Sequence, residues 1–200
     1  MFEHVVEQVL AADWATFQKA RPQDVPGICM FIWDEMVHRN VTSFPSKIAP
    51  YTQNNFSGVA EFIQKELGRP PVTEAYAVSY FNEITPKTSF IDVSLVRCWP
   101  NDIHIADVEF SDNRLPVHAG PKIKGELGRS YHGLHIFGDF INGLRGVAKE
   151  KGVERISLMV ADGALYPVFK KYGFEVSETY MAQIAFKKAG MGFPMVLQLK

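Results

Sequence analysis

The feature that most limits what this chain can fold into is an amphipathic helix pattern that leads within a few residues into an apolar strand. Apolar residues between Ile136 and Ala148 fall on one helical stripe, and Gly152 is a typical C-terminal cap. The segment "VERISLMVAD" follows and has the composition of a buried strand. A strand, loop, helix and strand in this order form a βαβ unit, whose helix N-terminus directs free backbone amides at an anion.

The first part of the chain is predicted to be rich in helices. Helical patterns occupy residues 3–20, the segment "PQDVPGICMFIWDEMVHRN" and the segment "FSGVAEFIQKEL", with Ser57 as an N-cap and Gly68 as the stop. Three strand patterns follow from Glu74: "AYAVSYF", "SFIDVSLVRCW" and "DIHIADVEF". Turn-forming residues join them, so an antiparallel meander is expected.

The last part of the chain is predicted to complete one domain. After "VERISLMVAD" come a short helix in "GALYPVFKKYGF" and two closing strands, "TYMAQIAFKK" and "FPMVLQLK". We therefore expect an α/β fold of the α+β type, with a mixed sheet flanked by helices. Residues 1–73 would form a helical, substrate-side part, and residues 74–200 would form the sheet and its binding core.

Charge and cysteine content narrow the range of partners. The formal net charge is -1, so no overall basic field would attract nucleic acid or an anionic membrane. Cys29 and Cys98 have no CxxC spacing, which argues against a structural zinc site and for a reducing compartment. The segment "MFEHVVEQVL" carries two glutamates where a signal peptide would be basic and then apolar. We expect a cytoplasmic protein without a membrane span.

The segments "KEKGVERISLMVAD" and "FKKYGFEV" resemble the C-terminal half of the GNAT superfamily of acyl-CoA N-acyltransferases, and the likeness extends over residues 131–176. The resemblance implies a splayed mixed sheet that holds the pantetheine of acyl-CoA between two strands, with "DIHIADVEF" carrying the splay. It implies acetyl-CoA or another acyl-CoA as co-substrate and an amine as acceptor. The closing strands of this fold often pair between subunits, which makes a homodimer an expectation.

The resemblance also implies a set of donor-binding residues. The pyrophosphate loop of the family reads Arg/Gln-x-x-Gly-x-Gly/Ala, and two registers are open. One is anchored on Gly133, with Ser130 first and His135 last; the other has His132 first and Phe137 last. Phe169 stands where the family often has a tyrosine that protonates the leaving thiolate, and Asp162 stands where it has an asparagine. The implied donor-binding residues are Val108, Phe110, Arg129, Ser130, Tyr131, His132, Gly133, Leu134, His135, Asp162 and Phe169.

Two carboxylates and a tyrosine are the main catalytic candidates. Asp107 and Glu109 alternate with apolar residues and therefore share one strand face, where a carboxylate can take the proton of an ammonium. Glu109 is the preferred base and Asp107 the second choice, although both could be solvated or pair with Arg97 or Arg114. Tyr166 lies one helical turn before Phe169 and is the candidate acid.

Histidines and lysines before the helix could serve the donor. His118, His132 and His135 could shuttle a proton or donate to a phosphate, and His135 is a further catalytic candidate. Lys122, Lys124 and Arg129 could bind a 3'-phosphorylated nucleotide. The alternative for both groups is capping, loop packing or solvated surface. Since no third ligand accompanies His132 and His135, no metal site is expected.

Three glycines in the helix pattern need an explanation, because each costs about 1 kcal/mol relative to alanine. Gly138, Gly143 and Gly146 could admit a close neighbour or the donor, or the helix could simply tolerate them. The leading functional hypothesis is an N-acyltransferase, most simply an acetyltransferase, in which the amine attacks the thioester directly. The alternatives are a binding or scaffold protein of the same fold, and a transferase that uses an aminoacylated or carrier-protein-bound donor.

Overall fold

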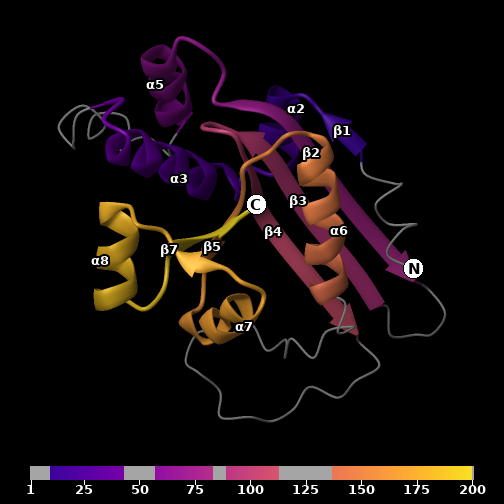
Figure 1. Ribbon diagram of the computed structural model, residues 1–200. Helices are drawn as coiled ribbons and strands as arrows, with labels where there is room; N and C mark the ends of the chain where they lie inside the picture. The colour runs from indigo at the N-terminus through magenta and orange to yellow at the C-terminus, as the bar shows by residue number, and fades with distance from the viewer. Residues whose placement is uncertain (1–9, 43–56, 83–88, 113–136, 200) are drawn as a thin grey trace.

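The computed structural model describes residues 10–42, 57–82, 89–112 and 137–199, and in these ranges it is a mixed α/β fold built on one open sheet (Figure 1). The seven strands of the described residues lie in the order β1-β2-β3-β4-β5-β7-β6. Helix α6, drawn in orange, crosses one face of this sheet in Figure 1. The predicted fold class, a mixed sheet flanked by helices, is confirmed.

The second, third and fourth strands form the antiparallel meander that turn residues predicted, and β1 adds a further antiparallel strand at its edge. β1 (Leu10–Ala12) pairs with β2 (Val72–Asn82), β2 with β3 (Ser89–Cys98), and β3 with β4 (Asp102–Asp112). β4 then runs parallel to β5 (Arg155–Val160), because helix α6 makes the crossover between them. β7 (Phe193–Gln198) lies between β5 and β6 (Glu175–Val176) and is antiparallel to both.

The helices begin and end close to the places that the sequence indicated. α3 (Val25–His38), α5 (Ser57–Leu67) and α6 (Phe137–Glu150) match three predicted helices. Gly68 and Gly152 have φ values of 65° and 62°, so each provides the left-handed conformation that commonly ends a helix. A 3-10 turn (Gly163–Leu165) leads into the short helix α7 (Tyr166–Lys171).

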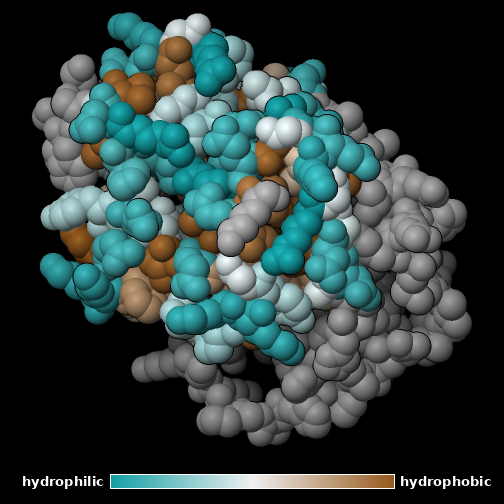
Figure 2. Space-filling view, viewed as in Figure 1, coloured by the Kyte–Doolittle hydropathy of each residue, from teal (hydrophilic) through white to brown (hydrophobic). Residues whose placement is uncertain are grey.

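Two hydrophobic cores occupy the two faces of the sheet. On one face α3 and α5 bury Ile28, Ile32 and Ile63 against apolar residues of β2 and β3. On the other face α6 and α7 bury Ile141 and Phe169 against apolar residues of β4, β5 and β7. Such burial is the main stabilising contribution of a sheet covered on both faces. The face drawn in Figure 2 is mostly hydrophilic, with hydrophobic residues in small groups. No helix among the described residues is long and apolar enough to cross a membrane.

The single helix predicted over residues 3–20 is wrong in its middle part. Leu10–Ala12 form β1, and α2 (Trp14–Ala20) begins only afterwards. Asp13 lies between them. Its backbone is still extended, and its carboxylate accepts a hydrogen bond from Thr16 N at 2.7 Å, which caps the start of α2. Pairing with Ala75–Ala77 of β2, more than 60 residues away, therefore overrides the local helical period.

The closing strand predicted for "TYMAQIAFKK" is also wrong, because Tyr180–Lys188 form helix α8. Met181, Ala185 and Phe186 pack against the two cores and Ala182 is fully buried, and their spacing of one and four residues is that of a helix face. Asp34 of α3 fixes the helix start by accepting hydrogen bonds from the Thr179 hydroxyl and from Met181 N. The strand that does pair with β7 is the two-residue β6.

Candidate functional site

β4 and β5 separate halfway along β4, and this separation defines the candidate site. The two strands pair only between Asp102–Ile105 and Arg155–Leu158, whereas β4 continues to Asp112 (Figure 1). In the described residues no other strand pairs with that edge of β4 beyond Ile105. Within the described ranges, the second half of β4 thus has an edge that no strand covers.

A β-bulge at Ala106 decides which side chains of β4 face which core. In the β3–β4 ladder Leu95 pairs with Ile105 and Ser94 pairs with Asp107, so Ala106 has no partner of its own. Without the extra residue, Asp107 would share the face of Ile105, which is packed under α6. With it, Asp107 turns to the α3 face, while Val108 packs against the α6 core.

Asp107 consequently joins a group of charged residues between the sheet and the start of α3. Asp24 is the N-cap residue of α3, and Arg21 is the C-cap residue of α2. Arg21 binds both carboxylate oxygens of Asp92 on β3, with Nη1 at 2.8 Å from Oδ2. Glu109 lies opposite Asp92 in the β3–β4 ladder. We call Arg21, Asp24, Asp92, Ser94 and Asp107 the carboxylate cluster.

The carboxylates of this cluster have perturbed acidities. Burial and, to a smaller extent, the charge of Asp107 raise the pKa of Asp24 to about 6, although Arg21 and Ser94 act in the opposite direction. Burial likewise raises the pKa of Asp107, and the charge of Asp92 adds to the effect. A carboxyl group with its pKa near 6 is able to accept and release a proton close to neutral pH, as a general base must.

Two buried polar atoms of the cluster lack partners. Asp24 is only 9% exposed and Ser94 is fully buried. Neither Asp24 Oδ2 nor Ser94 Oγ makes a hydrogen bond of normal geometry to any residue that the structure describes. Ser94 nevertheless lowers the pKa of Asp24 as a hydrogen-bond partner, so the hydroxyl and the carboxylate lie side by side and interact with each other.

The structure brings the two predicted bases onto one face but favours Asp107 over Glu109. Asp107 is the one that interacts with Asp24, whereas Glu109 lies two pairs further along β4, opposite Asp92. The expected alternative partner Arg97 instead binds Glu74, with 2.9 Å between Arg97 Nη1 and Glu74 Oε1. Arg114, the other alternative, lies outside the described residues.

Asp24 and Arg21 were missed by sequence reasoning. Asp24 stands directly before Val25 and Pro26, a pattern typical of a helix start. The sequence therefore indicates a helix N-cap at Asp24 and no functional role. Their chemistry depends on β3 and β4, about 70 and 80 residues further along the chain, and no local pattern predicts that contact.

On the α6 face the two apolar donor-side candidates with described side chains, Val108 and Phe169, are packed. The Phe169 ring lies against Phe137 and Phe174, at centroid distances of 5.6 and 6.2 Å, and its side chain is buried. Phe137 also meets the Tyr172 ring edge-on, so an aromatic group connects the N-terminus of α6 to α7. Val108 joins the same core. Phe169 is therefore part of the hydrophobic core between α6 and α7.

Tyr166 and Asp162 have local partners. The Tyr166 ring lies against Phe186 and Phe193, on the α8 side of α7, and its hydroxyl accepts a hydrogen bond from Lys170 Nζ at 3.3 Å. Asp162 accepts a hydrogen bond from Ala164 N at 2.9 Å and so caps the 3-10 turn before α7. The roles predicted for both residues stay predictions.

The remaining candidates lie outside the described residues. These are the donor-loop residues Arg129, Ser130, Tyr131, His132, Gly133, Leu134 and His135, the loop cations Lys122 and Lys124, His118, and the side chain of Phe110. In the ranges that the structure does describe, no group of three or more His, Cys, Asp and Glu residues could hold a metal ion.

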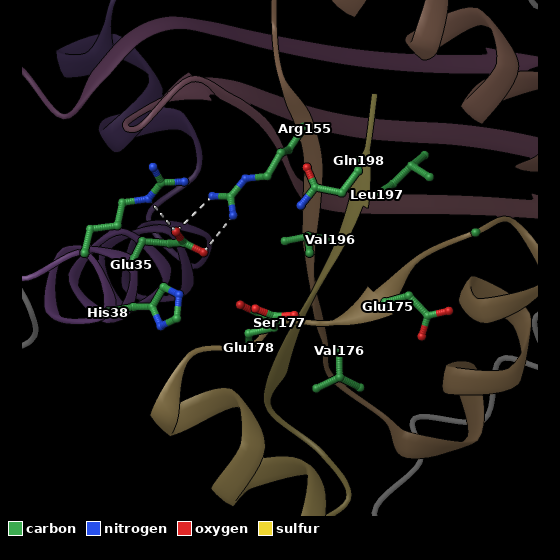
Figure 3. Close-up of a pocket in the computed structure, with 12 residues that line it drawn as sticks. Glu35, His38, Arg155, Glu175, Val176, Ser177, Glu178, Val196, Leu197 and Gln198 are labelled. Carbon is green, nitrogen blue, oxygen red and sulfur yellow. Dashed lines mark hydrogen bonds and ion pairs between the residues drawn. The ribbon is translucent and has the colours of Figure 1, made fainter. Parts of the chain in front are cut away.

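A separate cavity of about 650 Å³ lies at the other end of β5, where α3 faces β6 and β7 (Figure 3). Glu35 and Arg155 point towards each other at its wall, and Glu35 Oε2 is 3.0 Å from Arg155 Nη2 and 3.2 Å from Arg39 Nε. Arg155 also makes a two-bond ion pair with Asp102, both at 2.9 Å. The charges on the α3 side of this cavity are therefore already paired, and none of the residues predicted from the sequence lines it.

Comparison with known proteins adds no relative: no protein-family model matches the chain, and no curated protein matches it.

Proposed function

We propose that this chain is an N-acyltransferase of the GNAT type, which transfers an acyl group, most simply acetyl, from acyl-CoA to an amine. The observation that carries the proposal is the separation of β4 from β5 after Ile105, directly beside the carboxylate cluster. An unpaired strand edge can bind an extended chain that contains amide groups, as the pantetheine of CoA does. A proton acceptor on the opposite face of the same strand is what an amine acceptor needs.

The reaction needs one base and one acid. The acceptor arrives as an ammonium ion and gives one proton to the carboxylate cluster, which frees the nitrogen lone pair. The nitrogen attacks the thioester carbonyl carbon, so a C–N bond forms and the C–S bond breaks. The nitrogen loses its second proton as the thiolate leaves, and the thiolate takes up one proton to give free CoA. One proton is released to solvent overall.

Each side of β4 would have its own role in this reaction. The α6 face would bind the donor, with the N-terminus of α6 near the pyrophosphate, because free backbone amides there favour an anion. Phe137 and Phe169 would border the acyl chain as an apolar wall. Tyr166 stays our candidate for protonation of the thiolate, with Lys170 as the partner of its hydroxyl. Holding donor and amine together contributes through proximity as well as through acid–base chemistry.

The first test of the function is donor binding. We expect acetyl-CoA and CoA to bind the full chain in isothermal titration calorimetry and Gly133→Trp to abolish that binding. The matched control is Gly146→Ala, which alters an exposed position of α6 with open space around it. Binding of neither ligand would contradict an acyl-CoA donor. The same fold would then act as a binding protein, or its donor would be an aminoacyl or carrier-protein-bound group.

Catalysis is tested by release of free CoA in the presence of an amine panel. We expect Asp107→Asn to lower kcat at neutral pH by at least about tenfold, within the usual range for loss of a general base. Glu109→Gln should have a smaller effect, since Glu109 lies two pairs beyond Asp107 on β4, opposite Asp92. Tyr166→Phe should lower kcat without raising KM for the amine. Glu61→Gln removes an exposed carboxylate of α5 and serves as the control.

A further inference from the structure

We propose that the cavity of Figure 3 is a binding site for a guanidinium group, separate from the place of acyl transfer. The inference goes beyond the proposed function and does not depend on it, because other residues carry it. Gln198 lines the cavity, and Asp107 belongs to the carboxylate cluster. The two residues are separated by two strand spacings and by the stretch of β4 that begins at Asp102, which is about 10 Å across the sheet and about 15 Å along it.

The floor of the cavity consists of side chains on the α3 face of the sheet. Gln198 lies directly opposite Arg155, and Glu175 lies directly opposite Val196, so the members of each pair share a face. Val196 packs into the core under α3, which identifies this face. The C-terminal end of α3 forms one wall, and the segment after β6 contributes Glu178, which Figure 3 shows on the side of α3.

The arginines at the α3 wall are already compensated. Glu35 bonds Arg155 Nη1 at 3.1 Å and Arg39 Nε at 3.2 Å, and Arg155 also binds both carboxylate oxygens of Asp102. Two guanidinium groups thus face two carboxylates. His38 lines the same wall and adds no charge when it is counted as neutral at pH 7. This network therefore neither attracts nor repels a further ion strongly.

Two other carboxylates of the cavity have no such compensation. Glu175 and Glu178 both line it, and neither carboxylate makes a hydrogen bond or an ion pair with a described residue. Lys170 of α7 interacts electrostatically with Glu175, but its ammonium group donates to Tyr166 and forms no ion pair with Glu175. The C-terminal end of a helix such as α3 adds partial negative charge. The cavity therefore favours a cation.

The polarity of the lining favours a guanidinium group over other cations. Val176, Val196 and Leu197 give the cavity an apolar part beside its carboxylates. A guanidinium group is planar and weakly hydrated, so it enters such a place at a lower cost than a compact ammonium group does. It also binds a carboxylate through two parallel N–H groups, as Arg155 does with Asp102. In the described ranges no group of acidic side chains could hold a metal ion instead.

The edge of β7 offers a further contact to a chain that carries the guanidinium group. β6 pairs with only two residues of β7 and does not reach Gln198. Leu199 N donates to Glu154 O on the β5 side, and neighbouring residues of a strand direct their backbone groups to opposite sides, so those of Gln198 point away from β5. No backbone hydrogen bond joins them to another described residue on that side. An arginine in an extended peptide would use this edge, whereas a small guanidinium compound would use the carboxylates alone.

The test compares three probes that share an n-butyl group, each titrated into the full 15N-labelled chain at pH 7 and followed by amide chemical shifts. n-Butylguanidinium is the expected ligand, n-butylurea has its planar shape without the charge, and n-butylamine has the charge without the planar shape. We expect n-butylguanidinium to bind at least about tenfold more tightly than n-butylurea, because its bonds to carboxylates are charge-assisted. It should bind about threefold more tightly than n-butylamine, which is more strongly hydrated.

Glutamine variants locate the site. Glu178→Gln and Glu175→Gln should each weaken the binding of n-butylguanidinium by about three- to tenfold and leave that of n-butylurea unchanged, since each removes a charge and keeps the shape of the side chain. Glu61→Gln, on the exposed side of α5, is the matched control and should change neither. Thermal unfolding verifies that each variant is folded, and one folded variant of the two is sufficient.

A blocked tripeptide, acetyl-Ala-Arg-Ala-amide, distinguishes the two sources of the guanidinium group. Tighter binding of the tripeptide than of n-butylguanidinium would identify an arginine of a partner protein, because the peptide backbone then adds contacts at the edge of β7. Equal or weaker binding would identify a small free compound. Both results support the guanidinium site.

The outcomes that overturn the site are distinct from those that concern the proposed function. Absent binding of n-butylguanidinium, equal affinity for n-butylurea, or unchanged affinity in a folded glutamine variant would each overturn it. Tighter binding of n-butylamine would overturn the guanidinium class, and displacement of n-butylguanidinium by Mg²⁺ would replace it with a metal site. Acetyl-CoA should bind the glutamine variants as it binds the wild type, so either inference can fail while the other stands.

Discussion

Ser94 and Asp107 face each other directly across the β3–β4 ladder, and the residue before Asp107 is the bulged Ala106. This pairing places a half-buried carboxylate beside a fully buried hydroxyl at the point where β4 leaves β5. One inserted residue therefore has two effects. It turns Asp107 away from the hydrophobic core under α6, and it directs that carboxylate towards Asp24 at the start of α3.

Asp24 is expected to reduce the stability of the folded protein at neutral pH. Its pKa is raised from 3.8 to about 6 on folding, so the folded state binds its proton more tightly than the unfolded state. Stability is unaffected below pH 4, falls as the pH rises from 4 to 6, and stays lower above pH 6. Asp24→Asn should therefore raise the free energy of unfolding at pH 7.5 by about 1–2 kcal/mol, and by much less at pH 4.

Urea unfolding at the two pH values measures this difference. Gain of stability together with loss of amine binding is the result expected of a residue retained for a ligand. A variant that is less stable than the wild type at pH 7.5 would instead identify Asp24 as a structural residue. Ser94→Ala is the companion variant and should be neutral or stabilising, because it removes an unpaired hydroxyl.

Arg21 is expected to set the pH range of the reaction. Its positive charge lowers the pKa of both Asp24 and Asp107. Arg21→Gln removes that charge and leaves Asp92 uncompensated, so both pKa values should rise. Because a base acts only when deprotonated, the acidic limb of the pH–rate profile should move to higher pH by up to about one unit. An unshifted limb, with Arg69→Gln as the exposed control, would show that these carboxylates are not the base.

The ion pair between Arg155 and Asp102 joins β5 to β4 at the start of their paired stretch, and it should contribute strongly to stability. Both residues are buried, and Arg155 also bonds Glu35 of α3. Arg155→Met leaves the buried Asp102 without its cation and Glu35 with Arg39 alone, and breaking such a buried pair typically costs about 3–5 kcal/mol. Arg97→Met is the matched control, since Arg97 pairs with Glu74 at a part-exposed place, where such pairs contribute about 1 kcal/mol or less. Urea unfolding measures the loss of stability in each variant. Similar losses in the two variants would contradict the claim that the buried ion pair of Arg155 contributes more than the part-exposed one of Arg97.

The sequence predicted elements well where one local period extended over a whole element. The stripe of α6, the alternation in β3 and β4 and the glycine stops after α5 and α6 are all found in the structure. Two elements were predicted wrongly from the sequence: β1, which was expected to be helical, and α8, which was expected to be a strand. β1 exists because β2 provides a distant edge, and α8 begins where Asp34 of α3 accepts hydrogen bonds from Thr179 and Met181. Neither partner is visible in the segment itself.

The candidate site was predictable only in part, for the same reason. The alternation of Asp107 and Glu109 with apolar residues identified a carboxylate face on β4. The bulge at Ala106 produces no local signal, since alanine fits a regular strand as well as a bulge. Asp24 reaches the site only because α3 packs on the sheet, and its raised pKa comes from burial that a sequence does not reveal.

The glycines of α6 have different explanations, and alanine substitutions should separate them. A Cβ atom at Gly138 would lie 3.0 Å from Tyr172 Cε1, whereas one at Gly146 would meet open space. Gly146→Ala should therefore raise the free energy of unfolding by about 0.5–1 kcal/mol through helix propensity alone. Gly138→Ala should give no such gain, because the Tyr172 ring must move away from its contact with Phe137. In a Tyr172→Leu background the gain from Gly138→Ala should reappear, since the ring that opposes it is absent. Equal stabilisation by both alanines in the wild-type background, measured by urea unfolding, would mean that Gly138 is not retained for the close approach of Tyr172.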